Sequence, residues 1–539
     1  MLGNYDQAES LCSDYLSGNQ ADARILNMLG ILALKKGELQ KAISLFARAC
    51  EHDSQSVQAR FNWGLACMRQ KKYTQAIEHF DAVIKLNPSY SQAYNIAGVA
   101  FQNIGHRHNA QRCFHRAIEL NAKNIQAYIN LGNFLSAQQE YMQAIRAYQA
   151  ALNIDPENFE GYKWLGFALS KYGDIRDAIA SFQEALNICP NDIECLRELA
   201  QMHSHLGHKE ETISTLERLI DLAPNVPFDH NLIAMSLLDQ GRIQEALKHY
   251  QKAFRLQPSS SVIHSNMLLA TNYFAHSNAE QLMQAHRDWD SMHAAHLRPR
   301  NVHYFLEPAP HKKLNIGYVS PDFRKHSVSY FFLPLIQNHS RSEVETFCYS
   351  DVSKPDDLTM NIRKSADHWR EIYNQSDDQA AELVRNDGID ILVDLAGHTG
   401  NNRLLLFARK PAPIQVTWLG YPNTTGLDAM DYRIGDAVTD PEGITDSLCS
   451  EELVRLSNGF LCYVASENIP DVQPPPAMKN GFITFGSFNN LAKVNADVVA
   501  LWSQILHEVP DSRLILKSRT LADMPTRQRF ENAFTNHGI

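Results

Sequence analysis

The chain has 539 residues, of which 44% are hydrophobic and 20% are charged. A single hydrophobic core does not grow to this length, so we expect several domains or a long repeat array. The 60 acidic residues outnumber the 50 basic ones and leave a net charge of -10. This balance argues against nucleic acid as a partner, because its phosphates attract a basic surface.

The amino terminus and the cysteines indicate the compartment. Residues 1–12 lack the basic start and the apolar run of a secretory signal, and no later stretch approaches the roughly 18 uninterrupted apolar residues of a membrane helix. The nine cysteines are odd in number and form no C-x-x-C pair, which indicates reduced thiols rather than disulfides or a zinc site. We therefore expect a cytoplasmic protein with no bound metal and no membrane partner.

A period of 34 residues runs through the first half of the chain. Alanine fills seven of its eight slots, with Thr212 in the other: Ala8, Ala42, Ala76, Ala110, Ala144, Ala178 and Ala246. A glycine stands twelve residues before five of these slots: Gly30, Gly64, Gly98, Gly132 and Gly166. A proline stands twelve residues after five of them: Pro88, Pro156, Pro190, Pro224 and Pro258. This is the tetratricopeptide pattern. It predicts about eight repeats over residues 1–274, of which the first is partial.

The pattern also predicts how a repeat is built. Glycine or alanine lets the two antiparallel helices of a repeat approach closely, and an aromatic four residues after the alanine, such as Phe80, is expected to fill the space between neighbouring repeats. Proline ends the second helix. Stacked helix pairs leave a concave groove that suits peptides or protein segments. The repeats could also join copies of the chain into a homo-oligomer, and this alternative is left undecided.

Asparagines mark the predicted groove. The slot two residues before the small residue holds Asn62, Asn130 and Asn266, and Asn133 follows Gly132. An amide offers donors and acceptors without charge, which suits binding to the main chain of an extended peptide. Solvated helix asparagines are an equally open interpretation, because Met28, Ile96, Trp164, Glu198 and Leu232 occupy the same slot elsewhere.

The period ends in a junction at residues 275–313. One more helix is expected to begin at Ser260, and a polar helix rich in histidine and alanine follows over Asn278–Leu297. Asn301–Lys313 contains two prolines and no periodicity, so we expect a linker there.

From Leu314 short β-rich runs alternate with helical segments, which predicts an open α/β sheet over residues 314–472. The expected strands are Leu314–Val319, Val344–Tyr349, Ile389–Leu395, Ile414–Trp418 and Tyr432–Ile434. The expected helices are Ser329–Gln337, Asp357–Ala366, Asp378–Asn386 and Asn402–Ala408. Ligands bind at the carboxyl ends of the strands of such a sheet, so the loops Ser320–His326, Ala396–Asn402 and Leu419–Gly426 are the candidate site.

A second β-loop-α unit begins in residues 473–539. Strands are expected at Phe482–Ser487 and Arg513–Leu516, with a loop over Phe488–Lys493 and a helix over Ala496–His507. Residues 473–539 leave room for two or three strands only, so we expect an incomplete second sheet.

Five ordered segments carry a family resemblance. They are GYVSPDFRKH (Gly317–His326), DGIDILVDLAGHT (Asp387–Thr399), RKPAPIQVTWLGYP (Arg409–Pro422), TTGLDAMDYR (Thr424–Arg433) and FGSFNNLAK (Phe485–Lys493). With the repeats ahead of them, they resemble the catalytic region of family 41 glycosyltransferases, the O-linked N-acetylglucosamine transferases and their SPINDLY relatives.

The resemblance implies a fold and a reaction. The fold is an all-α tetratricopeptide superhelix followed by an α/β, two-lobed Rossmann-like region of the GT-B type, with the second lobe incomplete. The reaction is an inverting, metal-independent transfer of N-acetylglucosamine from UDP-GlcNAc to Ser or Thr hydroxyls of proteins, with the repeats holding the acceptor. No cofactor is implied beyond this nucleotide sugar donor.

The resemblance also assigns roles to individual residues. Lys493 matches the lysine that contacts the diphosphate, where a cation neutralises the charge of the leaving group. His326 matches a histidine proposed as a base or a donor contact, and a histidine can accept a proton near neutral pH. The implied donor-binding residues are Asn490, where many relatives have glutamine, His398 as a pocket wall, and Gly420, Tyr421 and Pro422.

Three alternatives stay open. The family's catalytic region continues with a His-Thr-Thr stretch and an acidic residue that hold UDP, and the chain lacks them, so an inactive or weakly active fragment is expected. In a second alternative the repeats act as a protein-binding scaffold without catalysis. In a third the donor is GDP-fucose, as in SPINDLY-type relatives.

Overall fold

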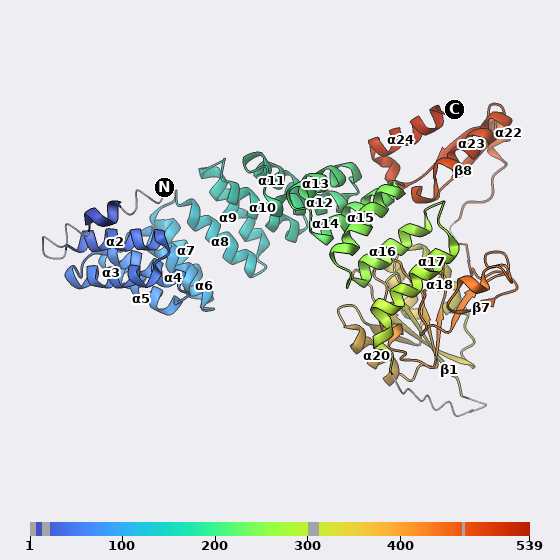
Figure 1. The fold of residues 1–539 in the computed structure, drawn as a ribbon, viewed down its shortest axis with the longest axis horizontal. Helices are drawn as coiled ribbons and strands as arrows, with labels where there is room; N and C mark the ends of the chain where they lie inside the picture. Colours follow the sequence, from blue (N-terminus) through green and yellow to red (C-terminus); the bar gives the residue numbers. More distant parts are fainter. Residues whose placement is uncertain (1–6, 13–21, 300–311, 466–468) are drawn as a thin grey trace. The chain divides into compact units, whose positions relative to one another are not determined.

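The structure is a computed structural model that describes residues 7–12, 22–299, 312–465 and 469–539. The chain forms two compact units, Met1–Leu206 and Gly207–Ile539 (Figure 1). Repeat helices make up the first unit, and the second unit contains further repeat helices together with the α/β region. Much of the predicted partial first repeat lies outside the described residues, as does most of the predicted linker.

Pairs of antiparallel helices build the first unit. They are α2 (Ala23–Lys36), α3 (Leu39–His52), α4 (Val57–Arg69), α5 (Tyr73–Leu86), α6 (Ser91–Asn103), α7 (Arg107–Leu120), α8 (Ile125–Ala137), α9 (Tyr141–Ile154), α10 (Phe159–Tyr172), α11 (Ile175–Ile188) and α12 (Ile193–Leu206). Several first helices begin at a polar cap: the side chains of Ser56, Asn124 and Asn158 each accept a hydrogen bond from a backbone amide of the first turn. Such caps satisfy amides that have no partner within the helix.

The glycine and the aromatic residue of one repeat contact each other. A methyl group added at Gly64 would lie 2.6 Å from the ring of Phe80, and one added at Gly98 would lie 2.7 Å from Phe114. Both rings are fully buried. The close approach of the two helices was predicted, and the ring of Phe114 also meets Phe134 of the next repeat, with centroids 5.8 Å apart. The contact between each ring and the glycine of its own repeat was not predicted.

The second unit opens with repeat helices. They are α13 (Lys209–Leu222), α14 (Pro227–Asp239), α15 (Ile243–Leu256), α16 (Ser261–Asn272) and α17 (Ala279–Trp289), followed by the π-helical turn η1 (Asp290–Ala294) and the 3-10 turn η2 (Ala295–Leu297). The helices predicted from Ser260 and over Asn278–Leu297 are therefore present. Ser260 and Asn278 serve as their amino-terminal caps.

A sheet of seven parallel strands forms the centre of the second unit. The strands are β1 (Leu314–Ser320), β2 (Val344–Ser350), β3 (His368–Glu371), β4 (Ile391–Asp394), β5 (Ile414–Thr417), β6 (Tyr432–Gly435) and β7 (Glu452–Arg455), in the order β3-β2-β1-β4-β5-β6-β7. The chain runs outward from β1 to β3 and then returns to β4 on the other side of β1. The five predicted strands are found, and the two that were missed, β3 and β7, are the edges of the sheet.

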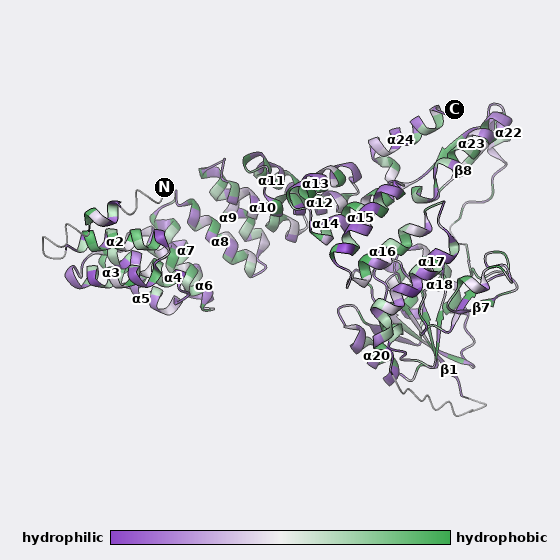
Figure 2. Ribbon diagram, viewed as in Figure 1, coloured by the Kyte–Doolittle hydropathy of each residue, from purple (hydrophilic) through white to green (hydrophobic). Residues whose placement is uncertain are grey.

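Helices cover both faces of this sheet. They include α18 (Ser327–Asn338), α19 (Asp357–Ser365), α20 (Asp377–Asn386) and α21 (Leu404–Ala408). Phe332 of α18 and Ile362 of α19 belong to one buried cluster with Val393 of β4, and α20 and α21 contribute to a second cluster with Leu392. Figure 2 shows much green in the central part of the sheet, as expected for inner strands that are buried on both faces.

Repeat helices contribute to the second cluster. Leu268 of α16 and Trp289 of α17 are buried together with Phe347 of β2 and Leu392 of β4. The Trp289 indole also donates a hydrogen bond to the Ser261 carbonyl at 3.1 Å. The predicted boundary at residue 274 therefore falls inside one packed core.

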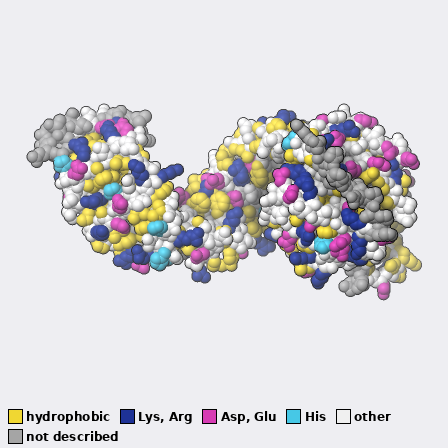
Figure 3. Space-filling model, turned by 90° about the horizontal axis from the view of Figure 1, so that it is seen from below, with side chains coloured by type: hydrophobic (Ala, Val, Ile, Leu, Met, Phe, Trp, Pro, Cys, Tyr) yellow, Lys and Arg dark blue, Asp and Glu magenta, His cyan; other side chains and the backbone are white. Residues whose placement is uncertain are grey.

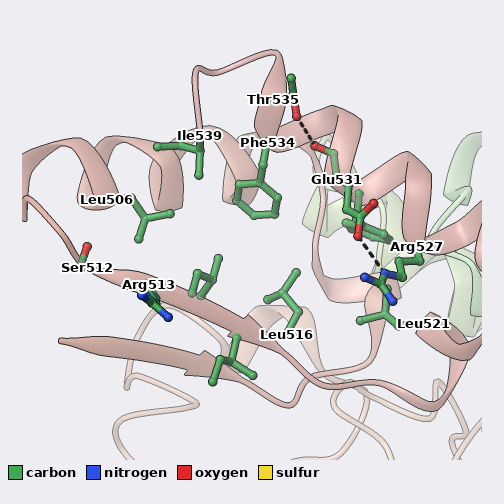
Figure 4. Close-up of a pocket in the computed structure, with 13 residues that line it drawn as sticks. Leu506, Ser512, Arg513, Leu516, Leu521, Arg527, Glu531, Phe534, Thr535 and Ile539 are labelled. Carbon is green, nitrogen blue, oxygen red and sulfur yellow. Dashed lines mark hydrogen bonds and ion pairs between the residues drawn. The ribbon is translucent and has the colours of Figure 1, made fainter. Parts of the chain in front are cut away.

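The carboxyl-terminal segment forms a small parallel pair of strands. Its elements are α22 (Pro476–Asn480), β8 (Thr484–Ser487), the 3-10 turn η4 (Leu491–Lys493), α23 (Ala496–Glu508), β9 (Arg513–Leu516), the 3-10 turn η5 (Arg519–Ala522) and α24 (Met524–Thr535). Both strands and the helix after η4 were predicted. Figure 4 shows Leu506, Leu516 and Phe534 around a cavity of about 880 Å³ in this segment.

Candidate functional site

Three cavities in the second unit differ in chemistry. The cavity of Figure 4 is lined mainly by leucine, isoleucine and phenylalanine side chains, which do not suit a diphosphate. A polar cavity of about 860 Å³, which we call the β1–β3 cavity, contains Arg324, Asp351, Lys354 and Arg403. A third cavity of about 590 Å³, the β5–β6 cavity, contains Lys493.

The β5–β6 cavity brings together residues from distant parts of the chain. Its walls include Gly420, Tyr421 and Pro422 from the loop after β5, and Asn272 and Tyr273 from the end of α16. Lys493 from η4 completes the cavity. Lys493 and the three residues of the Gly-Tyr-Pro segment, all predicted from the sequence, thus line one space at the carboxyl ends of parallel strands.

Lys493 brings a positive charge to this cavity. Its side chain is exposed, and it forms no ion pair with any residue that the structure describes. Three residues later α23 begins, with Asn495 as its cap. A free ammonium group beside a helix amino terminus is an arrangement that favours phosphate.

Arg433 is the other cation of the β5–β6 cavity, and it already has a carboxylate partner. Its guanidinium lies 2.7 Å from Asp440, and both side chains are buried, with 11% and 7% of their surface exposed. The same guanidinium donates a hydrogen bond to the Pro422 carbonyl at 3.3 Å. Arg433 therefore fixes the wall of the cavity, while the Lys493 charge stays available to a ligand.

The loop after β5 has an unusual backbone. Leu419 has a φ of 73°, which is rare for a residue with a side chain. A Cβ atom at Gly420 would collide with the Leu395 carbonyl oxygen. Only glycine fits this approach of the loop to the end of β4, which explains the glycine in the Leu-Gly-Tyr-Pro sequence.

His326 lies at the start of α18 and does not line either polar cavity. Its Nδ1 accepts the Val328 amide at 3.4 Å and lies 3.6 Å from Asp322 Oδ2. Because Nδ1 accepts, the neutral ring carries its proton on Nε2. The flanking Arg324 and Ser327 line the β1–β3 and the β5–β6 cavities respectively, so His326 sits between them and is arranged to donate a hydrogen bond.

His398 corrects one expectation. It is fully buried and forms no wall of the β5–β6 cavity. The Thr425 carbonyl accepts its Nε2 hydrogen at 2.8 Å, so Nδ1 accepts the Ser265 hydroxyl at 3.0 Å. Burial holds the pKa of His398 well below its ordinary value. With both ring nitrogens in use, His398 joins the loop after β4 to α16.

Asn490 caps the 3-10 turn η4, which carries Lys493. Its side-chain oxygen accepts the Ala492 amide at 3.1 Å and caps η4. The side chain is exposed and does not line the β5–β6 cavity. Its predicted contact with the donor remains a prediction.

The asparagines of the predicted groove are paired across neighbouring repeats. Asn62 donates to Asn27, Asn130 to Asn95, and Asn266 to Asn231, at 2.9, 3.0 and 3.0 Å. Asn133 instead accepts the Tyr148 hydroxyl at 2.7 Å. The three amide pairs share one geometry and a separation of 35 residues, whereas Asn133 helps to hold the core.

The sequence did not reveal Asn272 and His286. Both contact the Tyr421 hydroxyl, at 2.7 and 2.8 Å, although 149 and 135 residues separate them from it along the chain. Burial lowers the pKa of His286 to about 4, so the ring is neutral at pH 7. No sequence motif predicts a contact between two segments so far apart in the chain.

Other features of the surface bear on the expected partners. Within the described ranges, no group of three or more His, Cys, Asp or Glu side chains is placed to hold a metal ion. No helix in that part of the chain is long and apolar enough to cross a membrane. On the face in Figure 3, basic and acidic side chains are interspersed rather than gathered in one basic patch.

The chain is similar to known proteins in both of its parts. A sequence model described as glycosyl transferase family 41 matches residues 256–471, and tetratricopeptide repeat models match segments between residues 2 and 260. Over 294 residues the chain is 44% identical to the probable UDP-N-acetylglucosamine-peptide N-acetylglucosaminyltransferase SPINDLY of Oryza sativa subsp. japonica, which covers 54% of this chain and 32% of that protein. Over 207 residues it is 32% identical to the UDP-N-acetylglucosamine-peptide N-acetylglucosaminyltransferase of Caenorhabditis elegans, covering 38% of this chain and 18% of that one. The chain thus spans at most about a third of the length of these two relatives.

A solved structure matches more of the molecule. The O-GlcNAc transferase of Thermobaculum terrenum, in a lysine-to-methionine variant, is 35% identical and has a TM-score of 0.65. The match covers 71% of this chain and 72% of the bacterial one. Together with the family match over the sheet, this likeness shows that the chain belongs to glycosyl transferase family 41.

Proposed function

We propose that the protein transfers N-acetylglucosamine from UDP-GlcNAc to Ser or Thr hydroxyls of other proteins. The observation that carries the proposal is the unpaired Lys493 ammonium group in the β5–β6 cavity of a family 41 chain. The rice, worm and Thermobaculum relatives are named for N-acetylglucosamine transfer.

The chemistry follows from the charge in the cavity. An acceptor hydroxyl oxygen forms a bond to the anomeric carbon of the sugar, while the bond from that carbon to the diphosphate oxygen breaks. The hydroxyl proton passes to solvent or to a base, and UDP leaves with inversion at the anomeric carbon. Lys493 neutralises the charge that grows on the leaving diphosphate, the type of interaction that usually contributes most to catalysis.

The surrounding residues have supporting roles in this proposal. Gly420, Tyr421 and Pro422 form the wall against which the donor lies, and Arg433 holds Pro422 in place. His326 lies beside the cavity as a hydrogen-bond donor toward donor or acceptor, a role that the proton on Nε2 favours over that of the base. Asn490 stabilises the turn η4 that carries Lys493.

The repeats take the acceptor protein. Each of the pairs Asn27–Asn62, Asn95–Asn130 and Asn231–Asn266 uses one amide hydrogen and one oxygen, and the partly exposed Asn27, Asn130, Asn231 and Asn266 offer their remaining amide groups to the main chain of an extended peptide. All nine cysteines lie among the described residues and none is in a disulfide, which fits the reducing cytoplasm. We place the reaction there.

The test is sugar transfer by the whole chain from labelled UDP-GlcNAc to a protein mixture. Lys493→Met should lower the rate about 100- to 1,000-fold, since one preorganised electrostatic contact is worth that much. Lys479→Met changes an exposed lysine of the same segment and should leave the rate unchanged. A chelator should also leave it unchanged, because the reaction as proposed uses no metal.

Parallel reactions separate the alternatives. Transfer from GDP-fucose but not from UDP-GlcNAc would replace the donor in our proposal. If neither sugar is transferred while the repeats still bind proteins, the chain acts as a scaffold. Equal rates for the wild type and Lys493→Met would contradict the proposed role of the lysine.

A further inference from the structure

The Tyr421 hydroxyl lies in a complete hydrogen-bond network. Tyr421 lines the β5–β6 cavity, but only 7% of its surface is exposed. His286 Nδ1 lies 2.7 Å from the Leu282 carbonyl oxygen. A carbonyl only accepts, so Nδ1 carries the proton and Nε2 accepts the Tyr421 hydroxyl hydrogen at 2.8 Å. The hydroxyl oxygen in turn accepts from Asn272 Nδ2 at 2.7 Å.

The side-chain amide of Asn272 forms its hydrogen bonds within the protein. Its Nδ2 also donates to the Leu268 carbonyl at 2.9 Å, and its Oδ1 accepts from Asn423 at 2.9 Å. Although Asn272 lines the β5–β6 cavity, both of its amide hydrogens are therefore in use. We infer that it acts on a ligand through Tyr421 and Asn423, which flank Pro422.

These contacts hold the loop Leu419–Pro422, whose backbone is strained. Leu419 has a φ of 73°, and Gly420 lies against the Leu395 carbonyl. Such a conformation persists where its surroundings determine it at several points. The hydrogen bonds to Tyr421 and Asn423 come from α16 and α17, the helices that follow the last full repeat.

We propose that Asn272 and His286 are positioning residues that hold Tyr421, and through it the Leu419–Pro422 loop, in the shape that accepts the nucleotide sugar beside Lys493. The inference rests on the proposed function. It gives Asn272 at the end of α16 and His286 of α17 a role in shaping the nucleotide-sugar site, in addition to the role of the repeats in holding the acceptor.

Kinetics of the whole chain test this inference. His286→Leu removes the acceptor of the Tyr421 hydroxyl and should lower kcat/KM for the nucleotide sugar about tenfold, the usual effect of one lost buried hydrogen bond. His286→Gln supplies an amide oxygen in its place and should recover most of that loss. Tyr421→Phe in the His286→Leu background should add little, because both changes remove the same bond.

His264 offers a matched control. It is a buried histidine of α16 that hydrogen-bonds His293 at 3.1 Å and does not line the β5–β6 cavity. His264→Leu should lower the melting temperature as much as His286→Leu does but leave kcat/KM at the wild-type value. If the two variants reduce kcat/KM equally, or if neither does, the inference is overturned.

A second measurement does not depend on activity. Hydrogen exchange of the backbone amides in residues 419–426 should speed up in His286→Leu and stay unchanged in His264→Leu, with residues 344–350 of β2 as the internal reference. A wild type that transfers no sugar would defeat the proposed function alone. Unchanged exchange at residues 419–426 in His286→Leu would defeat the positioning role.

Discussion

Single glycines determine the shape of the β5–β6 cavity. A Cβ atom at Gly420 would meet the Leu395 carbonyl oxygen, and one at Gly435 would meet the Asp440 carboxylate that pairs with Arg433. The first neighbour is backbone and the second is a buried ion pair. Neither can move aside without changing the wall that surrounds Lys493.

We expect Gly420→Ala to weaken nucleotide binding strongly and to destabilise the second unit by about 1–3 kcal/mol or more, the usual cost of overpacking. UDP titration calorimetry and thermal melting measure the two effects. Gly400→Ala is the control, because no heavy atom lies within 4 Å of the added methyl group there. Wild-type affinity in Gly420→Ala would mean that the loop adapts and that its close approach to β4 has no role in binding.

At the scale of the helix pair that forms one repeat, the contact between the glycine and the aromatic ring fixes the distance between the two helices. Gly64 of α4 and Phe80 of α5 are one such pair, and the same contact recurs at Gly30, Gly98, Gly132 and Gly166. Helix packing distances depend on the side chains at the contact point. A Cβ atom added at any of these five glycines would lie 2.4–2.8 Å from the ring, so a larger residue there requires the ring or the helix to shift.

We expect Gly64→Ala to lower the urea midpoint of the repeats, with a loss of about 1–3 kcal/mol from overpacking. Phe80→Leu leaves a cavity and is also destabilising when made alone. The double variant should be more stable than the sum of the two single changes predicts, since each relieves the other. Strict additivity of the three midpoints would show that the added methyl group does not meet the ring.

At the scale of the whole second unit, the buried neutral histidines His286 and His398 join the repeat helices to the α/β region, and His264 pairs with His293 within the helical layer. Burial lowers the pKa of His264 and of His286 to about 4, and it holds the pKa of His398 well below its ordinary value. Each ring accepts or donates hydrogen bonds in its neutral form. Protonation would therefore place a charge among the groups that hold the junction.

This junction predicts a loss of stability in acid. The unfolded chain binds protons to these histidines below about pH 6.5, whereas the folded chain resists them down to about pH 4. The stabilisation is complete above pH 6.5 and is lost as the pH falls toward 4, at a cost on the order of 3 kcal/mol for each of His264 and His286. Asp394 acts in the opposite sense, because burial raises its pKa to about 6, but it is a single group.

Melting temperatures measured between pH 7.5 and pH 4.5 check this expectation. We expect the midpoint of the second unit to fall by at least about 5 °C over that range. His286→Gln removes one titrating ring and keeps the hydrogen-bond acceptor, so its midpoint should fall less than that of the wild type. An equal fall in both proteins would exclude His286 as a source of the acid sensitivity.

The sequence predicted the repeats and the inner strands because their signals are local. The period of 34 residues marked the helices, and apolar runs marked β1, β2, β4 and β5. The edge strand β3 reads His-Trp-Arg-Glu, and β7 reads Glu-Leu-Val-Arg. An edge strand is half exposed and carries charges that discourage pairing with other chains, so it lacks the apolar signal of an inner strand.

The candidate site was predicted in part for the same reason. The Gly-Tyr-Pro segment and Lys493 lie within recognisable motifs, and the structure brings them to one cavity. The partners of the groove asparagines were missed because each lies 35 residues away, one position off the period. Asn272 and His286 act on Tyr421 through contacts that only the folded chain creates.

The burial of Leu268 and Trp289 in the core of the sheet has a consequence for how such a gene can change. Recombination that exchanges the repeat array for another one has to place its breakpoint ahead of α16. A crossover further along would leave the helical layer of one parent against the sheet of another, with Ser265 and His398 no longer matched. The unit that is inherited as a whole therefore begins within the repeats, which agrees with a family match that starts at residue 256.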